Sequence, residues 1–267
     1  MLYIYCNTDG FDIFSNSRLR LSRIDKLNDP FELIFDVDKN SAQFNFRAKY
    51  KENANILLTW KEYLDNRKIV YNKDSFEEVL HKFIHFKTID FRESLKVLKE
   101  NWNQNLGIIC MSEAMDVIQM WAHYADKHKG IVVGIEENEF VNDRNFLITV
   151  CYRDKMVLFP LPDTEQELDQ YGEKYLPEVL ARKETNWFYE KEIRIFGKLE
   201  EVDKDGHYYL NVPTSAIKEI YLGLKSDDTL KMIALCLKKK PEYRHLKVFK
   251  MHRHENSFKL NPQEVSN

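Results

Sequence analysis

The chain of 267 residues contains little glycine and proline, with 8 Gly and 7 Pro. Such sparse turn-forming residues argue against a sandwich of many short strands and against a disordered chain. Cysteine is scarce as well, because the four cysteines lie far apart and no pair has the close spacing of a zinc or redox motif. Three of them fall in apolar, strand-like sequence, which predicts buried thiols.

An excess of one charge is also lacking, since the net charge is −3. A dedicated binder of duplex DNA would show a basic excess. No apolar run approaches the ~18 residues that a membrane helix needs. The N-terminus has no cationic stretch followed by an apolar one, so we expect no signal peptide. Together these absences predict a cytoplasmic protein that does not contact a membrane.

Several well-known catalytic motifs are missing from the sequence. It contains no G-x-x-x-x-G-K-[ST] and no G-x-G-x-x-G, which argues against a P-loop kinase and a Rossmann dehydrogenase. It also contains no H-E-x-x-H and no G-x-S-x-G, the signatures of zincin metalloproteases and α/β-hydrolases. We therefore predict no metal site.

Hydrophobic residues make up 43% of the chain, enough for a substantial core. Strand-like sequence opens the chain and dominates its second half, whereas residues from about 41 to 104 show the apolar spacing of helices. This pattern predicts an α+β fold with a mixed or antiparallel central sheet and the helical segment packed beside it. We expect a single domain over residues 1–257, with that segment as an insertion, followed by a tail at 258–267.

The first segment that suggests chemistry is residues 120–130, MWAHYADKHKG. On a helix, Trp121, Tyr124 and His128 fall on one stripe, while His123 falls on another face. One interpretation is a core stripe with surface histidines. The other is a ligand site, because these residues offer stacking surfaces and proton donors together. Gly130 suits a helix C-cap, since glycine takes a positive φ without steric cost.

The second segment is residues 185–196, TNWFYEKEIRIF. In a strand, side chains alternate between faces, so Glu190, Glu192 and Arg194 would share one face. One interpretation is a solvated face with a weak ion pair. The other is that one glutamate orients a sugar hydroxyl and stabilises the positive charge that develops at an anomeric carbon, as in glycoside cleavage.

A third segment, residues 28–32 (NDPFE), predicts a turn, because proline disfavours helix at the preceding residue and Asn and Asp bond their own backbone. Asn28 and Asp29 are candidates for a pocket mouth. The C-terminal region is locally basic. Such a run is usually a solvated face, and the alternative is contact with nucleic-acid phosphates.

These segments resemble those of a large bacterial family catalogued as a domain of unknown function. The resemblance spans nearly the whole chain, with Met111 in place of the usual Phe and Tyr5-Cys6 in place of a common Tyr-Arg pair. The segments that carry it are LYIYC at 2–6, NDPFE at 28–32, CMSE at 110–113, MWAHYADKHKG at 120–130, WFYEKEIR at 187–194 and IYLG at 220–223.

More weakly, the layout is similar to ADP-ribosyltransferase-type proteins, which have an opening strand with a polar or aromatic residue, a middle aromatic segment and a late strand with glutamate. Glu190 and Glu192 are similar to the paired glutamates of some of these transferases. The resemblance implies an enzyme that uses NAD as a substrate, transfers its ADP-ribosyl group to a protein or nucleic-acid acceptor, and serves bacterial defence or acts as a toxin.

In this hypothesis Tyr124 and Trp121 wall the nicotinamide pocket, and Glu192 holds the ribose hydroxyl and stabilises the transition state by preorganised charge. Glu190 activates the acceptor, and His123 or Arg194 binds pyrophosphate. The candidate catalytic residues are Glu192, Glu190, His123 and Tyr124. The candidate cofactor-binding residues are Tyr5, Ser22, Asn28, Asp29, Trp121, His128 and Arg194.

Two alternatives remain open at this point. In the first, the same aromatic and arginine side chains hold a nucleotide, another small ligand or a partner peptide without turnover, as a sensor module would. In the second, the protein is an RNA-cleaving nuclease in which His123 and Glu192 act as base and acid, with His128 as another candidate base.

Overall fold

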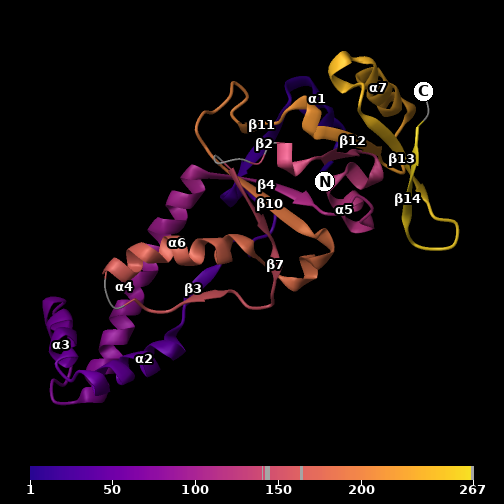
Figure 1. Cartoon of the computed structure of the whole chain (residues 1–267). Coiled ribbons are helices and arrows are strands. Elements are labelled where there is room, and N and C mark those ends of the chain that lie inside the picture. The colour runs from indigo at the N-terminus through magenta and orange to yellow at the C-terminus, as the bar shows by residue number, and fades with distance from the viewer. Residues whose placement is uncertain (140, 142–144, 163–164, 266–267) are drawn as a thin grey trace. The chain divides into compact units, whose positions relative to one another are not determined.

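The computed structural model describes residues 1–139, 141, 145–162 and 165–265. It confirms the α+β fold with a mixed, mostly antiparallel central sheet. Contacts divide the chain into two compact units (Figure 1). Unit 1 comprises Met1–Glu32, Asn103–Asp154 and Lys183–Asn267, and unit 2 comprises Leu33–Trp102 and Lys155–Arg182. The single domain over residues 1–257 with an insertion stays a prediction.

Unit 1 is built on one large sheet with the order β11-β2-β4-β1-β5-β12-β13-β14, while β10 pairs with both β4 and β6. The neighbours pair antiparallel except β12 and β13, which are parallel. Its strands are β1 (Leu2–Cys6), β2 (Arg18–Arg23), β4 (Leu106–Ser112), β5 (Ile131–Ile135), β6 (Asn145–Thr149), β10 (Glu192–Lys198), β11 (Tyr208–Asn211), β12 (Ile217–Leu222), β13 (Lys247–Arg253) and β14 (Leu260–Glu264).

The central strand β5 is buried along its whole length, which explains its continuous apolar sequence. Because side chains alternate along a strand, Val133 joins the main core and Val132 joins a second cluster. That second cluster contains Trp121, Tyr221 and Met251. Trp121 is thus part of the core packing of unit 1.

The helices of unit 1 are short: α1 (Asp12–Asn16), α5 (Ile118–Tyr124) and α7 (Asp228–Lys239). In α7 the Asp227 carboxylate accepts a hydrogen bond from the Leu230 amide, a standard N-cap. The predicted tail at 258–267 is wrong for Leu260–Glu264, which form β14 and pair antiparallel with β13 (Figure 1). The polar sequence LNPQE has little strand propensity, so its conformation comes from the ladder to β13.

Unit 2 contains the predicted helices of the 41–104 region: α2 (Lys39–Glu52), α3 (Ile56–Asn66) and most of α4 (Phe76–Asn105). Their aromatic faces pack on one another, with Trp60 stacked on Phe83 at a ring distance of 5.3 Å. The unit also includes α6 (Glu165–Ala181) and a parallel pair, β3 (Phe35–Val37) with β8 (Val157–Phe159). Two short strands, β7 (Cys151–Tyr152) and β9 (Arg182–Lys183), lie where the chain changes units.

Within the described residues, no helix combines the length and the apolar character that spanning a membrane requires. All four cysteines are free. The expectation of buried thiols is wrong for Cys110, which is exposed. Its side chain faces a cavity in unit 1 instead of the core.

Candidate functional site

The late acidic segment is not a continuous strand. Residues Thr185–Glu190 form a 3₁₀ helix, η5, whose first turn is capped by the Glu184 carboxylate at the Asn186 amide. Lys191 then adopts a left-handed conformation (φ 46°, ψ 51°), and β10 begins at Glu192. The prediction that Glu190, Glu192 and Arg194 share one face of a single strand is therefore wrong for Glu190, which ends η5, while Glu192 and Arg194 both lie in β10. The capped turn and the reversal at Lys191 bring the two carboxylates together by a different route.

The two glutamates meet at one ammonium group. The Lys183 Nζ donates to Glu190 Oε2 at 2.6 Å and to Glu192 Oε2 at 2.8 Å. The backbone of Lys183 is fixed, since its carbonyl accepts a hydrogen bond from the Arg153 amide at 2.9 Å. A cation therefore sits between two like charges that would otherwise repel each other.

A second cation extends this cluster. The Arg194 Nε donates to Glu192 Oε1 at 2.9 Å, and its Nη2 donates to Glu32 Oε1 at 2.6 Å. All five charged side chains are at most 5% exposed. This burial overturns the interpretation of a solvated strand face. Buried charges persist only when paired, and here three carboxylates face two cations, which leaves one net negative charge.

The protonation states follow from these contacts. Burial alone would raise the pKa of Glu192, but Arg194 and Lys183 outweigh burial and lower its pKa to about 2. Burial would lower the pKa of Lys183, yet Glu192 and Glu190 raise it above its ordinary value. In Glu32, burial outweighs Arg194 and Lys183, so its pKa is raised. The Glu32 Oε2 atom is buried and has no hydrogen-bond partner among the residues that the structure describes.

The middle aromatic segment reaches this cluster through Tyr124, at the end of α5. Its hydroxyl donates to Glu190 Oε1 at 2.7 Å and accepts a hydrogen bond from Asn28 Nδ2 at 3.0 Å. Burial, followed by the neighbouring Glu190, raises the pKa of Tyr124, so the hydroxyl stays a donor. Tyr124, Asn28 and the two glutamates, which lie in three separate sequence segments, therefore share one site.

These residues border a cavity of about 90 Å³ in unit 1. Tyrosine, methionine and leucine side chains form its apolar wall, and the acidic cluster forms its polar wall. It is lined by Tyr3, Tyr5, Leu27, Asn28, Glu32, Cys110, Met111, Met120, Tyr124, Lys183, Glu190 and Glu192.

Cys110 and Tyr5 complete the lining in different ways. Cys110 lies directly opposite Arg194 in the β4–β10 pairing, so both side chains point to the same side of the sheet. The thiol is accessible from the cavity, although protein atoms surround it closely enough that burial, aided by Glu192, raises its pKa. The Tyr5 hydroxyl donates to the Ala114 carbonyl at 2.8 Å and holds the start of α5 in place.

Four of the predicted site residues lie outside this cavity. Trp121 is fully buried and its Nε1 donates to the Met115 carbonyl at 2.8 Å, so its predicted stacking on a ligand is wrong. His123 is exposed and does not line the cavity. His128 lines a different hollow. Ser22 is paired with Ile108 between β2 and β4 and is absent from the lining. His123 and His128, the candidate bases of the nuclease hypothesis, are both absent from the lining that contains Glu192, so the geometry does not favour that hypothesis.

Two further predicted residues support the site without lining it. Asp29 is buried, and its Oδ1 accepts a hydrogen bond from the Phe31 amide at 2.8 Å, which fixes the turn that carries Asn28 and Glu32. Arg194 is fully buried behind Glu192 and Glu32. Because these carboxylates hold Arg194 inside the protein, its position disfavours the predicted direct role in binding pyrophosphate.

Sequence analysis missed Lys183, Glu32 and Cys110. Glu32 lies in the NDPFE turn that drew attention to Asn28 and Asp29, so the same segment carried the signal. Lys183 lies shortly before the acidic segment. That segment has two glutamates and one arginine, so one carboxylate needs a cation from elsewhere in the chain. Cys110 belongs to a strand whose neighbours are core residues, and its cavity-facing position depends on pairing that the sequence does not reveal.

Comparison with known proteins gives one match. Residues 120–195 match a family described as "Protein of unknown function (DUF2971)". No curated protein and no solved structure showed significant similarity to the chain. The resemblance to ADP-ribosyltransferases therefore stays a prediction. The matched segment contains Tyr124, Lys183, Glu190, Glu192 and Arg194, so the part of this chain that is similar to the DUF2971 family carries most of the acidic site.

Proposed function

We propose that the protein is an NAD-using glycosyl-transfer enzyme that breaks the bond between nicotinamide and ribose. The observation that carries this proposal is the environment of Glu190. This carboxylate is 3% exposed, accepts hydrogen bonds from Tyr124 and Lys183, and lines a tyrosine-rich cavity.

The chemistry needs such a carboxylate. Cleavage of an N-glycosidic bond develops positive charge on the ribose ring, as in other glycosyl transfers. A buried carboxylate that is already oriented stabilises this charge without reorganising at the moment of reaction. The net negative charge of the cluster and the tyrosine rings of the wall also favour the positively charged nicotinamide ring in the ground state.

Glu190 and Glu192 would divide the work. Both oxygens of Glu192 accept hydrogen bonds from cations, so its charge is largely compensated. Glu190 accepts a hydrogen bond from one cation, Lys183, and its Oε1 accepts one from the neutral Tyr124 hydroxyl. We therefore give the stabilising role to Glu190 and a positioning role to Glu192, which holds Lys183 and Arg194 in place. The stabilising role expected for Glu192 from the sequence thus passes to Glu190.

The size of the cavity limits what it receives. A volume of about 90 Å³ holds several water-sized groups, whereas pockets for whole ligands usually measure about 300–1,000 Å³. Only the reacting edge of the nicotinamide–ribose end of NAD would reach into the cavity, and the rest of the dinucleotide would lie outside. The acceptor of the ADP-ribosyl group would be water, a protein or a nucleic acid. Cellular NAD loss by such an enzyme would suit a bacterial defence or toxin role.

The test is to incubate the purified protein with NAD and to quantify free nicotinamide by chromatography. We expect Glu190→Gln, which keeps the shape and removes the charge, to lower the rate at least ~100-fold, the loss typical for a removed stabilising group. Glu242→Gln, on the exposed surface of the same unit, is the matched control and should leave the rate unchanged. Circular dichroism checks that both variants fold.

Two results would contradict the proposal: no nicotinamide release by the wild-type protein with candidate protein and nucleic-acid acceptors present, or an unchanged rate in the Glu190→Gln variant. If NAD binds without nicotinamide release, the observation favours the sensor-module alternative.

A further inference from the structure

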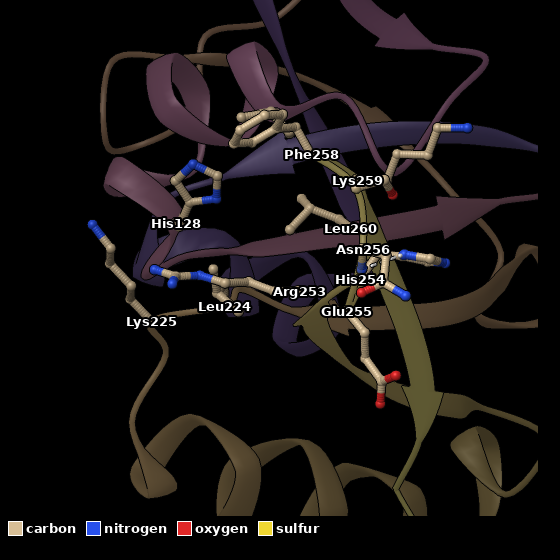
Figure 2. Close-up of a pocket in the computed structure, with 12 residues that line it drawn as sticks. His128, Leu224, Lys225, Arg253, His254, Glu255, Asn256, Phe258, Lys259 and Leu260 are labelled. Atoms are coloured by element: carbon tan, nitrogen blue, oxygen red, sulfur yellow. Dashed lines mark hydrogen bonds between the residues drawn. The ribbon is translucent and has the colours of Figure 1, made fainter.

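A second, larger hollow lies in unit 1 at the hairpin between β13 and β14 (Figure 2). Its volume is about 570 Å³, within the range of pockets that hold a small organic ligand. No residue lines both this hollow and the acidic cavity, so the two are separate. The hollow therefore needs an explanation of its own.

The charges around this hollow are mostly positive. Figure 2 shows the Arg253 guanidinium and the Lys225 ammonium on the same side as the His128 ring, whereas the Glu255 carboxylate extends away from them. Within the part of the chain that the structure describes, Lys225 and Arg253 make no ion pair. Two uncompensated cations in a protein of net charge −3 indicate an anionic ligand.

An aromatic ring lines the same hollow as these cations. Phe258, in the hairpin loop, is 100% exposed, and it lies above Leu260 in Figure 2. Leu260 belongs to the apolar cluster of Trp121, and Leu224 packs against that cluster from the floor of the hollow. A hollow that combines an exposed aromatic ring with an arginine and a lysine suits a nucleotide, with the base stacked on the ring and the phosphate on the cations.

His128 adds a fixed polar group. Its ring stacks parallel to Trp121 at 6.4 Å, and its Nδ1 is buried without a hydrogen-bond partner among the described residues. Asp126, Lys127 and His128 all have positive φ, an uncommon conformation for three consecutive residues other than glycine. Burial, with a smaller contribution from Lys225, lowers the pKa of His128, so the ring is neutral at neutral pH and can donate one hydrogen bond.

We propose that this hollow binds a nucleotide, with its phosphate on Arg253, Lys225 and His128 and its base on Phe258. A free nucleotide and a nucleotide within a single-stranded nucleic acid both offer this phosphate and this base. This inference goes beyond the proposed function and does not rest on it, because it predicts binding, and the acidic cavity takes no part.

The experiment measures the affinity of the full chain for three probes by calorimetry at low salt: AMP, ribose 5-phosphate and a single-stranded oligonucleotide of eight nucleotides. Arg253→Ala should weaken AMP and ribose 5-phosphate alike, by at least about tenfold, because both lose the bidentate phosphate contact. Phe258→Ala should weaken AMP by at least about tenfold and change ribose 5-phosphate by less than about twofold, since only AMP carries a base.

Lys239→Ala, an exposed lysine at the end of α7, is the matched control and should change no affinity. An oligonucleotide that binds at least about tenfold tighter than AMP identifies a strand as the ligand, and equal affinities identify a free nucleotide. The proposal is overturned if none of the three probes binds at millimolar concentration, or if AMP binding survives both Arg253→Ala and Phe258→Ala. Because Glu190→Gln should leave AMP affinity intact, failure of this proposal and failure of the NAD proposal are distinguishable.

Discussion

The acidic site places five charged side chains where water scarcely reaches them, and each charge depends on its neighbours. Lys183 joins Glu190 to Glu192, and Arg194 joins Glu192 to Glu32. Removing a charge that no neighbour can replace leaves its partner buried and uncompensated. Glu192 holds the central position, since it is the carboxylate that accepts a hydrogen bond from each of the two cations.

We predict that Glu192→Gln lowers the free energy of unfolding by about 3–5 kcal/mol at pH 7, the cost of breaking a buried ion pair. The pKa of Glu192 falls from 4.5 to about 2 on folding, so its stabilisation is complete above pH 4.5 and is lost as the pH falls towards 2. The difference between wild type and variant should therefore shrink across that interval. Urea unfolding at several pH values measures this difference in the free energy of unfolding. The control Glu242→Gln should show no difference from wild type at any pH. A gap that stays constant down to pH 2 would contradict the assignment.

Glu32 should behave in the opposite way. Burial raises the pKa of Glu32, so folding favours its protonated form. The stabilisation that this proton gives is fully present below the ordinary pKa of glutamate and is lost as the pH rises through the raised pKa. We predict that Glu32→Gln costs much less than Glu192→Gln at pH 7, within about 1 kcal/mol of wild type. Its stability relative to wild type should increase as the pH rises above the ordinary pKa of a glutamate. The same urea experiments test this. A cost as large as that of Glu192→Gln would show that Arg194 needs the Glu32 charge.

At the scale of single residues, the sequence predicted part of the acidic site. Asn28, Tyr124, Glu190 and Glu192 stand out because polar and aromatic residues cluster in short segments. Lys183 was missed because its role depends on where η5 returns the chain. The role of Trp121 was misjudged because a tryptophan in a helical stripe suits a ligand pocket and a core equally well.

At the scale of elements, two reversals of the backbone shape the site region. Lys191 ends η5 in a left-handed conformation, and Asp126–His128 form a left-handed run after α5. Neither is predictable from alternation or helical spacing, because both patterns assume that an element continues. Gly130 shows the same limit. The sequence assigned it a positive φ as a C-cap, whereas the positive φ values fall on the three residues before Lys129.

Gly130 is required for a different reason. A Cβ atom at this position would lie 2.1 Å from the Cys6 carbonyl oxygen and 3.0 Å from the Ala125 backbone. Because backbone atoms have no rotamer with which to yield, we predict that Gly130→Ala destabilises the protein by more than about 2 kcal/mol. Gly206→Ala is the matched control: its φ is +81° but nothing lies within 4 Å, so a cost near 1 kcal/mol is expected. Equal costs in chemical unfolding would contradict the close approach.

At the scale of the whole molecule, composition and periodicity predicted the fold class and the helices of the 41–104 region. They missed β14, since its residues adopt a strand only when β13 pairs with them. The division into two units likewise depends on distant contacts, because the second unit is assembled from two separate stretches of chain. Contacts between distant segments decide both features, and a single sequence contains no direct record of them.

The chain passes between the two units four times, and α4 continues through one of these crossings without a break. Unfolding either unit would therefore disturb the ends of the other, and we predict one cooperative thermal transition with equal calorimetric and van't Hoff enthalpies.

Leu64→Ala tests this prediction, because Leu64 is fully buried in unit 2 and its truncation should cost about 2–5 kcal/mol. The single transition should move to lower temperature, and amide exchange in β5 of unit 1 should accelerate with it, whereas the exposed control Leu58→Ala should change neither. Two transitions, of which Leu64→Ala moves only one, would show that the units unfold independently and that α4 acts only as a linker.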